Sequence, residues 1–189
     1  MPFPVITTAR LTLRQVTEED LSLMVELNSD AAVMAHILGR PASADETAAE
    51  WSERLSRRTD AARGLGYWAG YHGDQFVGWW GASAFVDHLD MSSIGYRLPR
   101  AAWGMGLATE AGRAMVTQGF SAPGVTRVVA STMAINHASR HVLQKVGLLP
   151  VRIHVQQWDD PIPGSEHGEA EYELERPMRP ETSRPASAR

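Results

Sequence analysis

Residues 103–111, WGMGLATEA, combine small side chains with a helix start in a way that suits phosphate binding. Three small residues, Gly104, Gly106 and Ala108, come directly before the helix that Thr109 is expected to open. The first N–H groups of a helix lack intrahelical acceptors, and the helix dipole attracts anions to that end. A pyrophosphate could therefore approach the backbone here. Two glycines also suit a tight joint between a strand and a helix, so they leave both roles open.

Two other nucleotide-binding patterns do not match this segment. The GxGxxG pattern would need a glycine at position 109, where the sequence has a threonine. The Walker pattern would need a Lys-Ser or Lys-Thr pair after the glycines, and none follows. The spacing therefore argues against a dinucleotide site and against a P-loop.

A second segment of interest is AINHASRHVLQKVGL, residues 134–148, which begins where a predicted strand ends. Asn136 can cap the following helix, and a capping amide can still contact a ligand. Ser139 lies one turn inside that helix, where serine is a mediocre helix former. Its hydroxyl either bonds back to the backbone or points at a ligand, and its position alone does not decide between these roles.

The elements that must position the two segments can be read from hydrophobic periodicity. Period-2 alternation and turn residues predict strands at 10–16, 67–71, 75–85, 92–99, 125–132 and 169–177. Apolar stripes and capping residues predict helices at 17–30, 45–58, 109–120 and 138–148. This order indicates an α+β domain with a mixed, largely antiparallel sheet and a crossover between residues 93 and 147. Ligands tend to bind at such switch points.

Composition limits the classes of protein that fit. With 189 residues and 43% hydrophobic content, we expect one domain over residues 1–176, followed by a disordered Pro- and Arg-rich tail at 177–189. A net charge of −4 argues against nucleic-acid binding. The absence of cysteine excludes a disulfide framework and a cysteine nucleophile. No membrane span or secretory signal is recognisable, so we expect a soluble cytoplasmic protein.

Together the motifs resemble one known family. The strings GYRLPRAAWGMGLATEA (95–111) and NHASRHVLQKVGL (136–148), with TARLTLRQVTEED (8–20), resemble the GNAT superfamily of N-acetyltransferases, in particular its RimJ/RimL-like branch. The resemblance spans residues 8–176. It implies a GNAT-like α+β fold, with a twisted, mostly antiparallel sheet of about six or seven strands, about four flanking helices and splayed central strands.

The resemblance also implies acetyl-CoA as co-substrate. In the superfamily pattern Gln/Arg-x-x-Gly-x-Gly/Ala, Trp103 takes the first place, Gly106 the fourth and Ala108 the sixth. Backbone amides of residues 104–109 would then bind the phosphates, and the pantetheine arm would pair with the strand that ends at Leu98. The cofactor-binding residues implied in this way are Leu98, Trp103, Gly104, Met105, Gly106, Leu107, Ala108, Thr109, Asn136 and Ser139.

Direct acetyl transfer needs a neutral amine, an oriented thioester, oxyanion stabilisation and a proton for the leaving thiolate. The resemblance implies Ser139 as the catalytic residue that donates to the thiolate, and a backbone N–H near Leu98 as the group that polarises the thioester carbonyl. An α-amine, with a pKa of about 7.7–8.0, needs far less help to be neutral than a lysine, with a pKa of about 10.4.

The general base is where the sequence departs from the family. Many relatives have a glutamate two residues before the GY of the strand, and here that position is Ser93. Serine cannot replace a carboxylate as a base at neutral pH. A substitute base could come from either of two loops, although a solvated side chain without a catalytic role is the favoured interpretation of each candidate. The candidates are Asp87, His88 and Asp90 in one loop, and Glu166 and His167 in the other. The same His-acid neighbours lack metal-ligand spacing, so we expect no metal site.

An aromatic run, Tyr67, Trp68, Trp79 and Trp80, allows two interpretations. The rings could bind a cationic amine, but core packing is the favoured interpretation. Strand alternation places one of the adjacent tryptophans inward and the other on the opposite face. If either ring contributes to a substrate or a dimer contact, we expect it to be the outward one, and the sequence does not say which ring that is.

The leading hypothesis is therefore an N-acetyltransferase whose acceptor is a protein N-terminus or a small-molecule amine. An acyl-CoA-binding sensor or pseudoenzyme with the same fold stays as the alternative, because Ser93 replaces the glutamate. A purely structural domain would leave the two motifs unexplained. We expect a monomer or a homodimer, with no nucleic acid or membrane as partner.

Overall fold

The structure is a computed structural model that describes residues 4–176, except for the side chains of residues 58 and 59. The predicted tail at 177–189 lies outside the described residues. The strands are β1 (Ile6–Thr7), β2 (Thr12–Gln15), β3 (Gly66–His72), β4 (Gln75–Ala84), β5 (Met91–Arg97), β6 (Arg127–Met133), β7 (Leu149–His154) and β8 (Glu169–Glu175). The α-helices are α1 (Leu21–Asn28), α2 (Ala31–Met34), α3 (Ala44–Ser56), α4 (Arg58–Ala62), α5 (Leu107–Ser121) and α6 (His137–Lys145).

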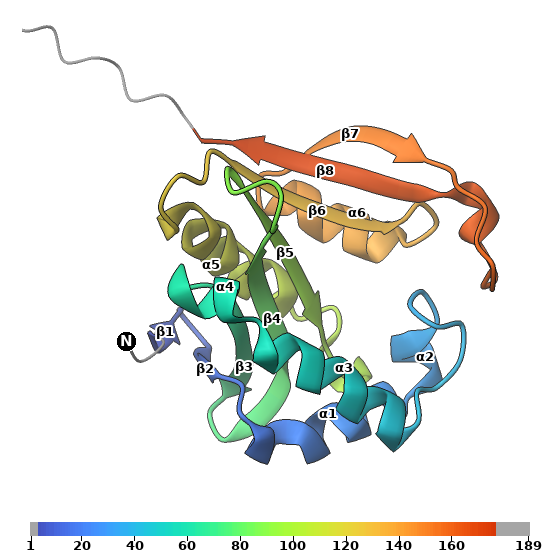
Figure 1. The fold of residues 1–189 in the computed structure, drawn as a ribbon. Coiled ribbons are helices and arrows are strands. Elements are labelled where there is room, and N and C mark those ends of the chain that lie inside the picture. The colour runs from blue at the N-terminus through green and yellow to red at the C-terminus, as the bar shows by residue number, and fades with distance from the viewer. Residues whose placement is uncertain (1–3, 177–189) are drawn as a thin grey trace, which may run out of the picture.

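The described strands form one sheet in the order β1-β2-β3-β4-β5-β6-β8-β7 (Figure 1). Every neighbouring pair is antiparallel except β5 and β6, which are parallel because α5 carries the chain back between them. The predicted α+β class with a mostly antiparallel sheet is confirmed. The expected numbers, about six or seven strands and about four helices, were too low, since the described part of the chain has eight strands and six α-helices.

The elements that the sequence reading missed are short or carry no burial pattern. β1 has only two residues, and α2 and α4 have four and five, which is too short for a periodic signal. All six residues of β7 are exposed, so this edge strand shows no alternation between buried and exposed positions. Its pairing with β8 could be recognised only from the tertiary structure.

Both faces of the central sheet are covered, which gives the domain two hydrophobic cores. The core between the sheet and α1 and α3 contains Tyr67 and Trp79, whereas the core on the α5 and α6 side contains Trp68 and Trp80. The adjacent tryptophans do face opposite ways, as predicted. The expectation that one of them is outward is wrong, because helices cover each face of β4 and both rings are buried.

The two parallel strands separate soon after they meet. β5 and β6 pair only at residues 91–93 and 127–129, although each strand continues for four more residues. The predicted splay of the central strands is therefore present. Because parallel strands end at the same edge of a sheet, the N-termini of α5 and α6 both lie at the open end of this split.

No helix within residues 4–176 is long and apolar enough to cross a lipid bilayer.

Candidate active site

The connection from β5 to α5 bends sharply through two glycines. After a short 3-10 helix (Arg100–Ala102), Gly104 and Gly106 adopt φ values of 72° and 78°. This left-handed region favours glycine, and Gly106 is the N-cap residue of α5. No described atom lies within 4 Å of the position that a Cβ on Gly104 would take. The loop is therefore both a tight joint and an open surface.

The first turn of α5 presents backbone amides to that surface. Glu110 donates its N–H to the Gly106 carbonyl at 3.0 Å, which is the first hydrogen bond of the helix. The amides of residues 107–109 precede it, at the positive end of a 15-residue helix. The buried side chain of Leu107 anchors this turn in the core. The arrangement suits an anion such as a phosphate.

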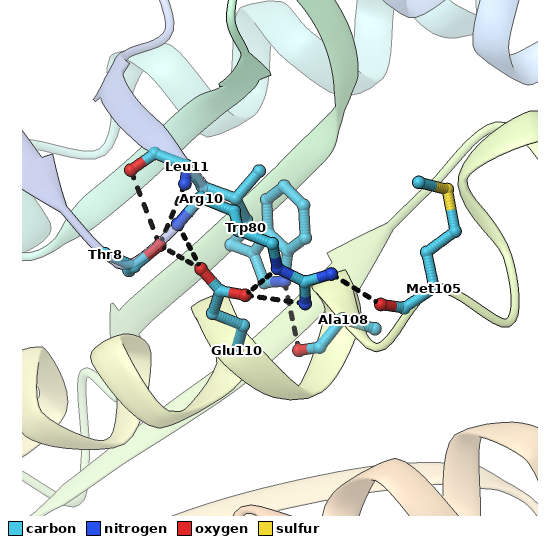
Figure 2. A network of polar contacts seen from close by, with 7 residues as sticks. All are labelled: Thr8, Arg10, Leu11, Trp80, Met105, Ala108 and Glu110. Carbon is cyan, nitrogen blue, oxygen red and sulfur yellow. Dashed lines mark hydrogen bonds and ion pairs between the residues drawn. The ribbon is translucent and has the colours of Figure 1, made fainter.

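A polar network ties this turn to the N-terminal segment (Figure 2). Arg10 donates from Nε to Glu110 Oε2 at 2.7 Å and from Nη1 to the Met105 carbonyl at 2.9 Å. Thr8 donates from Oγ1 to Glu110 Oε1 at 2.6 Å. Burial raises the pKa of the Glu110 carboxyl, but the bonds from Thr8 and Arg10 outweigh it and the pKa is lowered. The carboxylate stays charged and the loop is held in place.

Trp103 closes the 3-10 turn rather than entering the core. Its indole Nε1 donates to the Leu98 carbonyl at 2.8 Å, and about half of the residue, 49%, is exposed. Leu98 itself is buried beside the end of β5. These two predicted cofactor residues are therefore joined, and the exposed part of the indole borders the glycine loop.

The N-terminus of α6 brings the second motif to the same place. Asn136 is the N-cap, as predicted, and its Oδ1 accepts from the Ser139 N–H at 3.0 Å. Ser139 Oγ lies 3.0 Å from the phenol oxygen of Tyr96 on β5. The sequence reading missed Tyr96, because only the tertiary structure shows that this residue reaches α6.

The sheet face around Ser93 is uncrowded. Ser93 sits on the last rung between the parallel strands, opposite Val129 of β6, and shares its face with Gly95 and Arg97. No described atom lies within 4 Å of a Cβ built on Gly95. The space next to Ser93 at Gly95 is therefore open.

The first predicted source of a base is the loop before β5. Asp87 and His88 are exposed there. Asp90 is bound by Arg127 at 3.1 Å, and this hydrogen bond lowers the pKa of Asp90. Within residues 4–176, no hydrogen bond or ion pair links these three side chains to Ser93.

The second predicted source is the loop before β8. The side chains of Glu166 and His167 are 69% and 62% exposed and lie 3.6 Å apart. Neither forms a described hydrogen bond or ion pair with Ser93 or Ser139. Both side chains face solvent, in keeping with the interpretation of a solvated loop.

A carboxylate that the sequence reading did not consider lies on the same face as Ser93. Glu173 of β8 pairs with Val129, which in turn pairs with Ser93. Glu173 is half-buried and has no hydrogen bond or ion pair in the described part of the chain. Its neighbour on that face, Glu171, is bound by Arg152 at 2.8 Å. Only the strand order, which places β8 beside β6, reveals this position.

The aromatic core on the Ser93 face contains two arginines of the chain itself. Arg97, 6% exposed, binds Glu50 of α3 at 3.2 Å. Burial lowers the pKa of Arg97, although the charge of Glu50 opposes this. The guanidinium groups of Arg54 and Arg97 lie 4.8 and 5.4 Å from the Trp79 ring centroid. The cations at this ring are therefore structural.

Among the described residues, no three His, Cys, Asp or Glu side chains gather in a way that could hold a metal ion.

Comparison with known proteins decides the family. The Acetyltransferase (GNAT) domain matches residues 10–149, which include the glycine loop, Asn136 and Ser139. The chain belongs to the GNAT acetyltransferase family. FsC-acetyl coenzyme A-N(2)-transacetylase of Aspergillus fumigatus is 34% identical to this GNAT chain over 181 residues, covering 92% of this chain and 77% of that protein.

Solved GNAT structures share the fold. The acetyltransferase of Salmonella typhimurium that modifies the N-terminal serine of ribosomal protein L7/L12 has a TM-score of 0.73 and 20% identity, covering 92% of this chain and 98% of that one. Spermidine N-acetyltransferase of Vibrio cholerae, solved with CoA and spermine, has a TM-score of 0.73 and 14% identity, covering 88% and 96%. The acceptors of these proteins differ, so the shared fold does not specify the acceptor.

Proposed function

We propose that this GNAT protein transfers the acetyl group of acetyl-CoA to a primary amine in a ternary complex. The observation that carries the proposal is the meeting of two motifs at one end of the β5–β6 split. The amides of residues 104–109 lie at the start of α5, and Ser139 lies at the start of α6. One extended ligand, with phosphates at one end and a thioester at the other, would occupy both.

The split offers a path for the pantetheine arm between these two ends. Beyond Ser93, β5 has no ladder to β6, so backbone polar groups on that side are available to a ligand. We place the phosphates at the glycine loop, the pantetheine along residues 94–98, and the thioester near Ser139. Asn136, the N-cap residue of α6, would lie beside the thioester.

In the reaction, the amine nitrogen attacks the thioester carbonyl carbon, the C–N bond forms and the C–S bond breaks. The nitrogen loses a proton and the departing sulfur gains one, so the overall proton count is unchanged. Ser139 would donate a hydrogen bond to the developing thiolate, and a backbone N–H near Leu98 would polarise the carbonyl.

We propose an α-amine as the acceptor. The name of the Aspergillus relative specifies transfer to an N(2) atom, and the Salmonella neighbour modifies an N-terminal serine. An α-amine has a pKa of about 7.7–8.0, so roughly a tenth of it is already neutral at pH 7 without a strong base. This fits a chain with Ser93 where relatives carry a glutamate. Glu173, on the same sheet face, would receive the amine proton through water.

The binding step is tested first, by the rise in melting temperature on adding acetyl-CoA. The matched variants are Met105→Glu and Met105→Gln, which differ by one charge on an exposed side chain of the loop. We expect Met105→Glu to lose most of the shift through repulsion of the phosphates, and Met105→Gln to keep it. No shift in the folded wild-type protein would refute a CoA site.

The transfer step is tested by CoA release with amines of different classes. We expect turnover with amino acids or peptides that carry a free α-amine, and weaker turnover with polyamines and aminoglycosides. The alternative, an acyl-CoA sensor, is favoured by the replacement at Ser93. Stabilisation by acetyl-CoA without CoA release on any of these amines would support the sensor.

A further inference from the structure

Tyr96 and Ser139 form a hydrogen bond across the split that the proposed co-substrate would enter. The phenol oxygen lies 3.0 Å from Ser139 Oγ and 3.5 Å from the Ser139 carbonyl oxygen. Tyr96 belongs to the part of β5 that no longer pairs with β6, and Ser139 belongs to the first turn of α6. We propose that Tyr96 is a positioning residue that orients the Ser139 hydroxyl toward the sulfur of CoA. This inference rests on the proposed function.

Either hydroxyl can donate in the bond between Tyr96 and Ser139, and the proposal takes Tyr96 as the donor. Burial raises the pKa of the Tyr96 phenol, although the bond with Ser139 opposes this. The phenol is therefore protonated at neutral pH and has a hydrogen to donate. A serine hydroxyl has one hydrogen and two acceptor positions. When Tyr96 donates to Ser139 Oγ, the serine hydrogen is left for another acceptor.

The rest of Ser139 is already fixed. Its backbone N–H is bound by Asn136 Oδ1 at 3.0 Å, so the first turn of α6 cannot shift without breaking the cap. The Tyr96 bond then restricts rotation about the side-chain torsion. With Tyr96 as donor and the cap in place, the Ser139 hydrogen is left free to point away from Tyr96, toward the place where the CoA sulfur would lie. A developing thiolate there would accept it, and no covalent bond to Tyr96 is made or broken.

Removal of the Tyr96 hydroxyl oxygen separates a positioning role from a packing role, because packing depends on the ring and positioning depends on the oxygen. Tyr96→Phe keeps the ring and deletes only the hydroxyl. The control is Tyr71→Phe on β3, which also deletes a hydrogen-bonded hydroxyl, there bound by Arg14 at 2.7 Å. Ser139→Ala removes the oriented group, and the double variant Tyr96→Phe/Ser139→Ala tests whether the two act together.

The first measurement needs no acceptor amine. The thiol of bound CoA is titrated by the ultraviolet absorbance of its thiolate. We expect the pKa of this thiol to be lower in the wild-type protein than in Tyr96→Phe by about one unit, because an oriented donor stabilises the thiolate. Tyr71→Phe should match the wild type. Equal pKa values in the wild type and Tyr96→Phe would overturn the inference while leaving the CoA site intact.

The second measurement is steady-state kinetics with an accepted amine. We expect Tyr96→Phe to lower kcat about tenfold with the KM for acetyl-CoA unchanged, and to have no further effect in the Ser139→Ala background. An equal loss in both backgrounds, or a rise in KM alone, would overturn the positioning role. Wild-type protein that shifts the thiol pKa but releases no CoA would contradict the transferase proposal and leave the hydroxyl orientation supported.

Discussion

Arg10 and Glu110, 100 positions apart in the sequence, form an ion pair of 2.7 Å that joins the N-terminal segment to the first turns of α5. The same guanidinium also binds the Met105 carbonyl, so one side chain holds both the loop and the helix (Figure 2). The phosphate-binding surface proposed above is therefore not built by its own motif alone. It depends on a residue that no local pattern identifies.

Replacing Arg10 with methionine should weaken acetyl-CoA binding more than it weakens the fold. The variant keeps an apolar stem but loses the bonds to Glu110 and Met105, so the loop amides become less ordered. The Arg10 side chain is 43% exposed, and exposed ion pairs contribute little to stability. We expect the KM for acetyl-CoA to rise about threefold, measured by CoA release at fixed acceptor.

The matched control for that variant is Arg152→Met, which removes another exposed ion pair, to Glu171 on β8. It should leave the KM for acetyl-CoA unchanged. Equal effects of Arg10→Met and Arg152→Met would show that the loop does not depend on Arg10.

The capping amide of Asn136 should matter for stability. Asn136→Ala deletes the acceptor for the Ser139 N–H and should lower the free energy of unfolding by about 1 kcal/mol, measured by urea denaturation. Asn136→Asp retains an acceptor oxygen and should keep the stability. If the aspartate variant lost as much stability as the alanine variant, the capping assignment would be wrong.

The start of α3 should respond to acid. Hydrogen bonds from the Arg40 side chain and then from the Ser43 backbone lower the pKa of Glu46 from its ordinary 4.5 to about 2. Because the folded pKa is below the unfolded one, this stabilisation is present above about pH 4.5 and is lost as the pH falls toward about 2. In melting experiments at pH 6, Glu46→Gln should have a lower melting temperature than the wild type, because the variant lacks the charged carboxylate.

That difference should shrink as the pH approaches 2. Glu46 is at the surface, so the effect should be small and should weaken with salt. A constant difference between the wild type and Glu46→Gln from pH 6 to pH 2 would contradict the lowered pKa.

Filling the space above Gly95 should affect the acceptor and not the co-substrate. Gly95 is not in the left-handed region, so larger residues can take its backbone conformation. In the series Gly95→Ala, Gly95→Val and Gly95→Leu, we expect the KM for the acceptor to rise with side-chain size, reaching roughly tenfold. The melting-temperature shift with acetyl-CoA should persist. Loss of that shift along the series would place the space on the co-substrate side instead.

Local patterns identified the segments that are continuous in sequence. The WGMGLATEA joint, the Asn136 cap and most strands could be predicted because each depends on residues a few positions apart. The opposite orientations of Trp79 and Trp80 also followed from strand alternation. Their burial on both faces did not, because it depends on helices that are distant in the sequence.

Contacts between distant segments could not be predicted from one sequence. Tyr96 reaches Ser139 across 43 positions, and Arg10 reaches Glu110 across 100. Glu173 shares a sheet face with Ser93 only because β8 inserts between β6 and β7. Such placements depend on strand order, and neither residue type nor spacing specifies it.

The short ladder between β5 and β6 has a mechanical consequence. Three residue pairs join the two halves of an eight-stranded sheet, and beyond them the strands part. A pantetheine arm in the split would supply the hydrogen bonds that the sheet lacks there. Acetyl-CoA would then act as a temporary strand that continues the sheet from β5 across the split, and product release would remove it again.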